Sequence, residues 1–203
     1  LAIISAAYAI YHGPRGILKI ANRTSKLAKL FSEGVKATGF NILSDHFFDT
    51  VTVKTKDKTE EIYQKALAKK INLRNVNNEM ISVAFDEAKK LEDVNTLLEI
   101  FGSNKKYDQK VKVELNNIPS QLKRTSKYLT HPVFNKYQSE TEMLRYLKKL
   151  EDCDIALNRS MIALGSCTMK LNATAELIPI TWKEFSLPHP FVPTEQMKGY
   201  QHL

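Results

Sequence analysis

Apolar side chains recur at helical spacing through the first part of the chain. Residues 1–11 form an apolar run that ends at the sequence His12-Gly13-Pro14. Pro14 and Gly16 interrupt the helix, since proline lacks the amide hydrogen that a helix interior needs. A second run continues at intervals of three and four residues, which predicts one buried stripe on a second helix: Ile17, Ile20, Thr24, Leu27, Phe31 and Val35. Gly39 stands where a glycine ends many helices, so we expect two consecutive helices before it.

Alternating side chains then predict strands. In residues 49–54, two valines fall on one face of a strand and the threonines between them on the other. Residues 72–76 and 80–85 predict two more strands. We expect a tight two-residue turn between them, in which Asn77 and Asn78 take positive φ values.

Two further helices complete the first half of the chain. Residues 59–70 predict a helix that Thr59 caps, with two glutamates placed to favour its N-terminal dipole. Residues 94–101 predict another, which Gly102 ends. The order helix, strand, helix, strand, strand, helix predicts a small α+β domain over residues 1–102.

The stretch from residue 103 to residue 127 differs in composition. It is polar, is broken by Pro119, and carries seven basic side chains against two acidic ones: Lys105, Lys106, Lys110, Lys112, Lys123, Arg124 and Lys127, with Asp108 and Glu114. We predict a basic linker here, followed by a second domain over residues 128–203. Such a linker is usually only solvated, and the alternative is a docking strip for an acidic partner.

A helix opens the second domain, and a proline-rich tail ends it. Ser139 and Glu142 have the spacing of a capping box, in which each side chain satisfies an orphan amide. An apolar stripe follows: Met143, Leu144, Leu147 and Leu150. Four prolines after residue 178 predict an extended tail, which needs another body to pack on.

The amino-acid composition restricts the possible classes of function but does not identify one. The chain has 203 residues, 43% hydrophobic and 26% charged, which suits a globular protein of one domain or parts of two. The formal net charge is +8, but no concentrated patch argues for nucleic acid or an anionic membrane. Two cysteines and five histidines show no metal-ligand spacing. Because the chain begins with Leu1 and not Met, we expect the interior of a longer protein.

The densest group of polar and nucleophilic side chains lies in SMIALGSCTMKLN, residues 160–172. Its candidate binding residues are two hydroxyls, a cation and an amide: Ser166, Thr168, Lys170 and Asn172. This set suits a small anion such as a carboxylate or a phosphate. The alternative is a surface loop rich in turn-forming residues, in which the hydroxyls cap the local backbone.

Several motifs together resemble one family. LGSCTMKLN, ELIPITWKEF, HPFVP and GYQHL, in this order, are similar to glycine decarboxylase, the pyridoxal-phosphate P-protein of the glycine cleavage system. The upstream run YLTHPVFNKYQSETEMLRYLKKLE resembles the segment that precedes LGSCTMKLN in that family, and AIYHGPRG, SEGVKATGF and FFDTVTV resemble its middle portion. The likeness covers nearly the whole chain and is weakest over residues 57–121.

The resemblance implies a fold and a reaction for the whole enzyme. The fold class is α/β: a small α+β domain that ends the first half of the enzyme, then the start of a fold-type-I pyridoxal-phosphate-dependent transferase domain. The implied reaction, an oxidoreductase step of amino-acid catabolism, decarboxylates glycine and passes the aminomethyl group to the lipoyl arm of H-protein. A homodimer is implied, in mitochondria if the source is eukaryotic and in the cytoplasm if it is bacterial.

The resemblance also bears on single residues. The family's cofactor-binding lysine lies downstream of this motif, beyond Leu203, so Lys170 is either structural or electrostatic near the glycine carboxylate. Pyridoxal phosphate is then held mainly by residues beyond Leu203, and we expect the isolated chain to be inactive. His189 either orients the cofactor or is a hydrogen-bonded packing histidine. Two positions depart from the family's usual pattern, with Ala163 in place of proline and Gln138 in place of histidine.

Two other classes remain open from the residues alone. One is another fold-type-I enzyme, such as an amino-acid decarboxylase or an aminotransferase. The other is a non-catalytic basic binding module, for which a steep salt dependence of nucleic-acid binding would be the sign.

Overall fold

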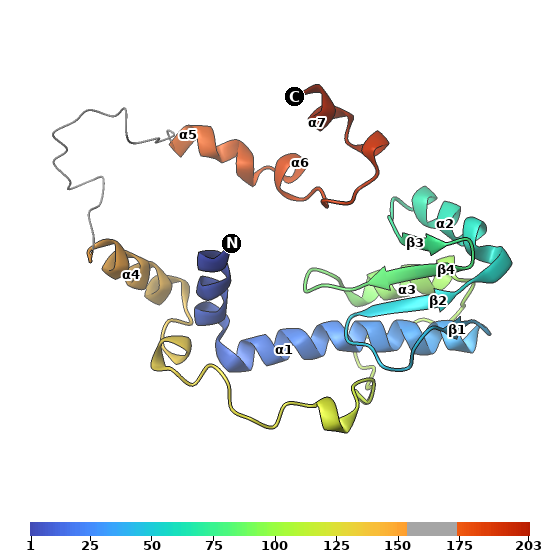
Figure 1. Ribbon diagram of the computed structural model, residues 1–203, viewed down its shortest axis with the longest axis horizontal. Coiled ribbons are helices and arrows are strands. Elements are labelled where there is room, and N and C mark those ends of the chain that lie inside the picture. The colour runs from blue at the N-terminus through green and yellow to red at the C-terminus, as the bar shows by residue number, and fades with distance from the viewer. Residues whose placement is uncertain (154–173) are drawn as a thin grey trace. The chain divides into compact units, whose positions relative to one another are not determined.

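We describe the protein from a computed structural model, which describes residues 1–153 and 174–203 (Figure 1). The chain divides into two compact units, residues 1–148 and residues 149–203. The first unit contains α1 (Ala2–Ala37), β1 (Asn41–Ile42), β2 (Thr50–Lys54), η1 (Lys56–Lys58), α2 (Thr59–Ala68), β3 (Arg74–Asn77), β4 (Met80–Ala84), α3 (Leu91–Ile100), η2 (Ser120–Leu122), η3 (Pro132–Asn135) and most of α4 (Glu140–Glu151). The second contains α5 (Thr174–Leu177), η5 (Ile178–Thr181), α6 (Lys183–Ser186), η6 (Thr194–Gln196) and α7 (Lys198–His202).

The long helix α1 is bent at the position where the sequence predicts a break. Gly13 has φ 61° and ψ 178°, which are not helical values, so α1 consists of two helices that meet at a kink. A β-carbon at Gly13 would lie 2.7 Å from the carbonyl oxygen of Phe134, and the left-handed φ further favours glycine. Tyr128 fastens the same junction by donating its hydroxyl hydrogen to the Pro14 carbonyl oxygen at 2.7 Å.

The sheet is antiparallel, with strand order β1-β2-β4-β3. In the β2–β4 pair, Val51 lies opposite Val83 and Val53 opposite Ile81, and all four side chains are buried. The alternation predicted for β2 is therefore confirmed. The mixture of helices with a small sheet likewise confirms the expected fold class.

The core of the first unit lies between α1, α3 and the sheet. Figure 1 shows α1 running along the sheet, with α3 close to it. Phe31 of α1 is fully buried, and its ring contacts those of Phe85 and Phe101 at centroid distances of 5.7 and 5.3 Å. The predicted apolar stripe of α1 supplies one wall of this core, because Leu27 and Val35 are buried with it.

Glycine ends α3 as the sequence predicts. Gly102 has φ 81°, its amide donates to the Glu99 carbonyl oxygen at 3.0 Å, and the Ser103 amide donates to that of Leu98 at 2.8 Å. These two bonds form a Schellman motif, which satisfies carbonyls that the helix leaves without partners.

Two local predictions are wrong. Thr59 does not cap α2: it lies in the first turn after Lys58, the N-cap residue, and its hydroxyl donates to the Lys56 carbonyl oxygen. In the hairpin, Asn77 pairs with Met80, so the connecting residues are Asn78 and Glu79. Neither asparagine has a positive φ. The Asn77 side chain instead accepts the Glu79 amide hydrogen at 2.9 Å, which closes the turn by a side-chain bond.

The segment expected to be a basic linker is held against the first unit. The Asn95 side-chain amide pairs with both backbone groups of Tyr107, at 2.9 and 2.8 Å. Asn117 is 1% exposed, and its side-chain nitrogen donates to Ser25 Oγ at 2.9 Å and to the Phe47 carbonyl oxygen at 2.8 Å. The seven basic side chains of this segment remain exposed. Residues 103–117 therefore form a strap, pinned at two asparagines, with its charges on the outside.

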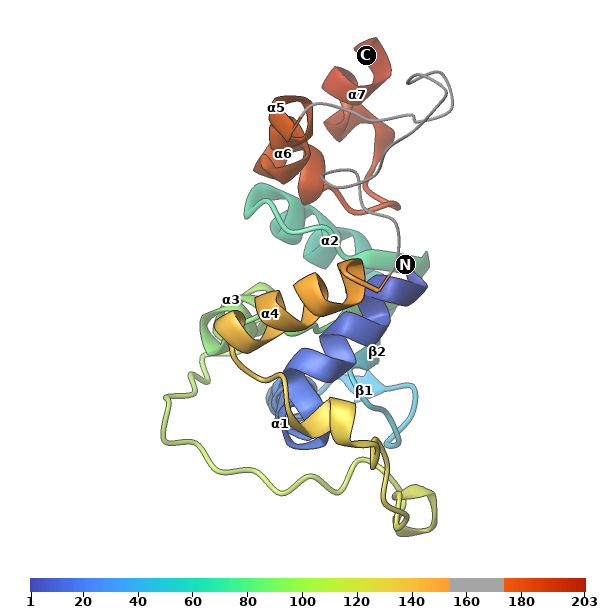
Figure 2. The ribbon, with the colours of Figure 1, turned by 90° about the vertical axis from the view of Figure 1, so that its left-hand side faces the viewer.

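Helix α4 ends the first unit with an uncovered apolar side. The predicted capping bond is present, since the Glu142 amide donates to Ser139 Oγ at 3.3 Å. Leu144, Leu147 and Leu150 are 61%, 47% and 48% exposed, and no residue of α4 is buried. Figure 2 shows the helix from the side. Its apolar stripe has no cover among the described residues.

Candidate functional site

The four predicted binding residues fall outside the part of the chain that the structure describes. Ser166, Thr168, Lys170 and Asn172 all lie within residues 154–173. Their role as a site for a small carboxylate therefore stays a prediction.

His189 is described, and its geometry limits what it can do. It is exposed and begins a tight turn, in which the Val192 amide donates to its carbonyl oxygen at 3.0 Å. Its ring nitrogen Nδ1 accepts the Phe191 amide hydrogen at 3.0 Å. An imidazole that accepts at Nδ1 carries its hydrogen at Nε2 when neutral, so His189 can offer one N–H donor to a ligand. This single donor is compatible with the predicted role of His189, in which the side chain would orient one acceptor atom of a cofactor.

Three aromatic side chains form a small group in the second unit. Phe185 contacts Trp182 and Tyr200 at centroid distances of 6.2 and 5.8 Å, and the Tyr200 hydroxyl donates to the Phe185 carbonyl oxygen at 2.8 Å. All three rings are 40% or more exposed. The described part of the tail therefore carries exposed aromatic surface, and the role of His189 in binding a cofactor stays a prediction.

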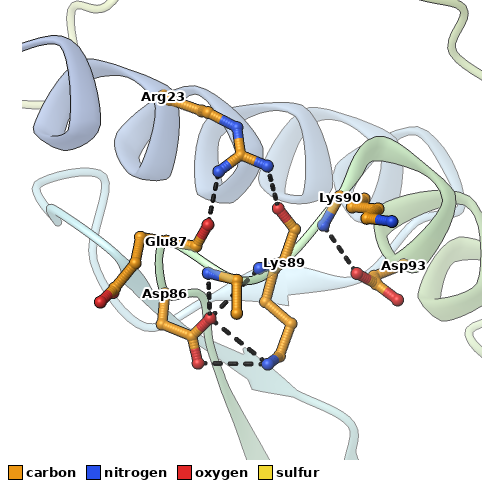
Figure 3. A network of polar contacts seen from close by, with 7 residues as sticks. Arg23, Asp86, Glu87, Lys89, Lys90 and Asp93 are labelled. Carbon is orange, nitrogen blue, oxygen red and sulfur yellow. Dashed lines mark hydrogen bonds and ion pairs between the residues drawn. The ribbon is translucent and has the colours of Figure 1, made fainter. Parts of the chain in front are cut away.

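The most developed polar cluster lies in the first unit and was not predicted as a site. Arg23 of α1 donates to the carbonyl oxygens of Glu87 and Lys89, at 2.5 and 2.6 Å (Figure 3). These carbonyls belong to the turn that leads from β4 into α3. Helical spacing places Arg23 outside the apolar stripe, but it gives no sign that two backbone carbonyls 64 and 66 residues away will meet it.

Asp86 shapes the same turn (Figure 3). Its carboxylate accepts the amide hydrogens of Ala88 and Lys89 at 2.9 and 3.2 Å, and the Lys89 ammonium lies 3.1 Å from it. Partial burial raises the pKa of Asp86, but the bonds from Lys89 and from the Ala88 amide outweigh it and hold the pKa below its ordinary value. The turn is therefore organised by an ionised carboxylate on one side and by Arg23 on the other.

The described residues show neither a cluster of metal ligands nor a membrane-spanning helix. Among residues 1–153 and 174–203, no three His, Cys, Asp or Glu side chains lie close enough to hold a metal ion. Within the same ranges, no helix is both long and apolar enough to cross a bilayer.

Comparison with known proteins identifies the family. Residues 1–101 match the family model of the glycine cleavage system P-protein. The motifs of the C-terminal half resemble the same family, and the chain belongs to it.

Three curated relatives extend the match over the whole chain. It is 63% identical over 203 residues to glycine dehydrogenase (decarboxylating) of Pelagibacter ubique. It is 50% and 46% identical to proteins of the same name from Photobacterium profundum and Paraburkholderia xenovorans. All of the chain is aligned in each case, and it spans 21–22% of the length of these relatives. The resemblance inferred from the motifs is thus confirmed.

Proposed function

We propose that the full-length protein containing this chain is a glycine decarboxylase that uses pyridoxal phosphate. The supporting observation is the 63% identity, across all 203 residues, with a relative named glycine dehydrogenase (decarboxylating). We further propose a cytoplasmic location, which the bacterial origin of the three relatives supports.

Bound pyridoxal phosphate would supply an electron sink that allows the carboxylate of glycine to leave as carbon dioxide. The residues of this chain would bind and orient the substrate. Ser166 and Thr168 would donate hydroxyl hydrogens to the glycine carboxylate, Lys170 would offset its charge, and Asn172 would add an amide donor. His189 would hold one acceptor atom of the cofactor through its Nε2–H, the nitrogen left available by the bond from Phe191.

The second half of the proposed reaction passes the aminomethyl group to the lipoyl arm of H-protein. The uncovered apolar surfaces of α4 and of the tail are consistent with a chain that is packed within a larger protein, and a homodimer of that protein is part of the proposal. We place the boundary between the two halves of the enzyme in residues 103–127. The strap would then join the small α+β domain to the start of the catalytic half.

Kinetics of the full-length enzyme test the substrate role. Thr168→Ala should raise the glycine KM or lower kcat about tenfold, because one hydrogen bond to a charged group is lost. Thr181→Ala is the matched control, since the Thr181 hydroxyl donates to the Ile178 carbonyl oxygen within its own turn. Unchanged glycine kinetics in Thr168→Ala would remove the stretch from the substrate site.

A labelling experiment tests the expected inactivity of the isolated chain. The 203-residue chain mixed with pyridoxal phosphate and borohydride should give no stoichiometric lysine adduct and release no carbon dioxide from glycine. One stable adduct at a single lysine would show that the cofactor lysine lies within this chain.

A further inference from the structure

A cavity of about 550 Å³ lies beside the Arg23 cluster. Its polar lining comes from three elements: Arg23 and Lys26 of α1, Lys90 and Glu92 at the start of α3, and Gln109 of the strap. Its apolar lining includes Leu27 and Leu30, which are 5% and 1% exposed and belong to the core. The cavity therefore has a fixed apolar floor and a largely cationic wall.

The charges of this wall are not balanced by the described residues. Nearby lysines have carboxylate partners, as in the Lys89–Asp86 pair at 3.1 Å and the Lys29–Glu33 pair at 3.7 Å. Within residues 1–153 and 174–203, Arg23, Lys26 and Lys90 form no ion pair. Three cations thus face the cavity with Glu92 as the one carboxylate in its lining, and that carboxylate already accepts from the Gln109 side chain at 3.4 Å.

Backbone bonds hold two of these cations in place. Arg23 uses two of its five N–H groups on the carbonyl oxygens of Glu87 and Lys89 (Figure 3). Lys26 uses one of its three on the Val111 carbonyl oxygen, at 2.7 Å, which also attaches the strap. The other N–H groups of these two side chains can still donate to an anion. Because both side chains are already held in place, binding an anion costs little additional side-chain entropy.

We propose that this cavity binds a small organic anion, a carboxylate or phosphate group carried on an apolar body. Sites for small molecules enclose roughly 300–1,000 Å³ and combine apolar walls with a few placed polar groups. The anionic group would bond to the free donors of Arg23, Lys26 and Lys90. The apolar body would pack against Leu91 and Val111, which are the half-buried apolar residues of the lining. None of these residues is among the candidate residues for glycine or pyridoxal phosphate, so the inference does not rest on the proposed function.

Fluorine NMR titration of the full-length protein tests the site, with 4-fluorobenzoate as the anionic probe. We expect saturable binding, and binding of uncharged 4-fluorobenzamide at least about tenfold weaker, since it lacks the charge-assisted bonds. Lys90→Met should weaken 4-fluorobenzoate binding about tenfold. Lys54→Met, which removes the same charge from an exposed position on β2, should leave the Kd within about twofold.

Lys26→Met is the second variant, because it also removes a cation from the wall and should weaken the probe about tenfold. Thermal unfolding of each variant separates lost binding from lost folding, and the comparison of benzoate with benzamide needs no variant at all. The proposal is overturned by the absence of saturable benzoate binding, by equal binding of the benzamide, or by an unchanged Kd in both lysine variants. Lys90-dependent binding of hexaglutamate without binding of 4-fluorobenzoate would also overturn it, in favour of a docking surface for an acidic polypeptide.

Discussion

The two units of this chain differ in whether their hydrophobic side chains are buried. In residues 1–148, eighteen hydrophobic side chains are buried, and helices and sheet cover one another. In the described part of residues 149–203, no residue is buried, and Leu187 and Phe191 are 69% and 89% exposed. The second unit is no less apolar than the first, so apolar content alone does not produce a core.

The difference depends on whether the helices and strands of a unit can pack against one another. In the first unit, α1, α3 and the sheet bury their apolar faces against one another, as the contacts of Phe31 with Phe85 and Phe101 show. In the described part of the second unit, α5, α6 and α7 are four or five residues long, which is too short for a helix to be stable without packing. We infer that the first unit folds by itself, whereas the second depends on the rest of a larger protein.

Division of the chain after Lys148 should show the largest effect. Residues 1–148 alone should unfold cooperatively, with a free energy of unfolding on the order of 5 kcal/mol or more. Residues 149–203 alone should show the circular dichroism of an unfolded chain and no transition on heating. As a control, residues 1–102 should be less stable than residues 1–148, because they lack the strap. Cooperative unfolding of residues 149–203 would contradict the comparison.

Phe31→Ala should show the next largest effect, about 3–5 kcal/mol of lost stability, because it leaves a cavity beside Phe85 and Phe101. Phe191→Ala is the matched change in the second unit and should alter the free energy of unfolding by less than about 0.5 kcal/mol. Denaturant titration of the 203-residue chain measures both. Equal losses would mean that the second unit has a core of its own.

Asn117→Ala should cost about 2 kcal/mol, because it leaves the Phe47 carbonyl oxygen and Ser25 Oγ without their donor in a buried place. Hydrogen exchange at the Phe47 amide, which donates to the Asn117 carbonyl oxygen at 3.1 Å, should accelerate. The neighbouring exposed Asn116→Ala is the control. If the two variants are equally stable, the strap is not pinned at Asn117.

Gly102→Ala should cost about 1 kcal/mol, because alanine is strained at φ 81° even though no atom lies within 4 Å of a new β-carbon. Gly199→Ala has the same open surroundings without the positive φ and lies in α7, so it should be neutral or slightly stabilising. Thermal unfolding distinguishes them, and an equal effect of both would exclude backbone strain as the cause.

The smallest effect concerns Asp86. Because its folded pKa is lowered, its stabilising contribution is complete above the ordinary value of 3.8 and disappears as the pH falls through the folded value. Its side chain is 53% exposed, so solvent screening limits the contribution to about 0.5 kcal/mol. Asp86→Asn should therefore be less stable than the parent at pH 7 and equal to it at pH 2, by denaturant titration. A difference that persists at pH 2 would refute an ionic origin.

Periodic patterns made most of the first unit predictable. Strand β2 and helix α2 begin within one residue of the expected positions, because burial on one face leaves a regular signal in the sequence. Strand β1 has only Asn41 and Ile42, too few residues to show alternation. The hairpin turn was misplaced because the Asn77 side chain bonds to the Glu79 amide, which removes the need for positive φ values.

No periodic pattern of apolar residues in the sequence predicts the strap. It is held by Asn95 and Asn117, whose amide groups bond to backbone atoms 12 and 70 residues away, and such bonds depend on the fold being formed already. The cationic cavity could not be predicted for the same reason, because Lys26, Lys90 and Gln109 come together only when the strap packs against the first unit. For the candidate glycine site, the residue types indicated a small anion, and the motif resemblance indicated that this anion is the carboxylate of glycine.

The kink at Gly13 has a consequence for how this protein is made. The heading of the first three helical turns is set by contacts with Tyr128, Phe134 and Gln138, which the ribosome adds more than a hundred residues later. Until those residues leave the ribosome, these three turns lack the contacts that fix their direction relative to the rest of α1. The N-terminal part of α1 is therefore synthesised well before the residues that fix its direction become available.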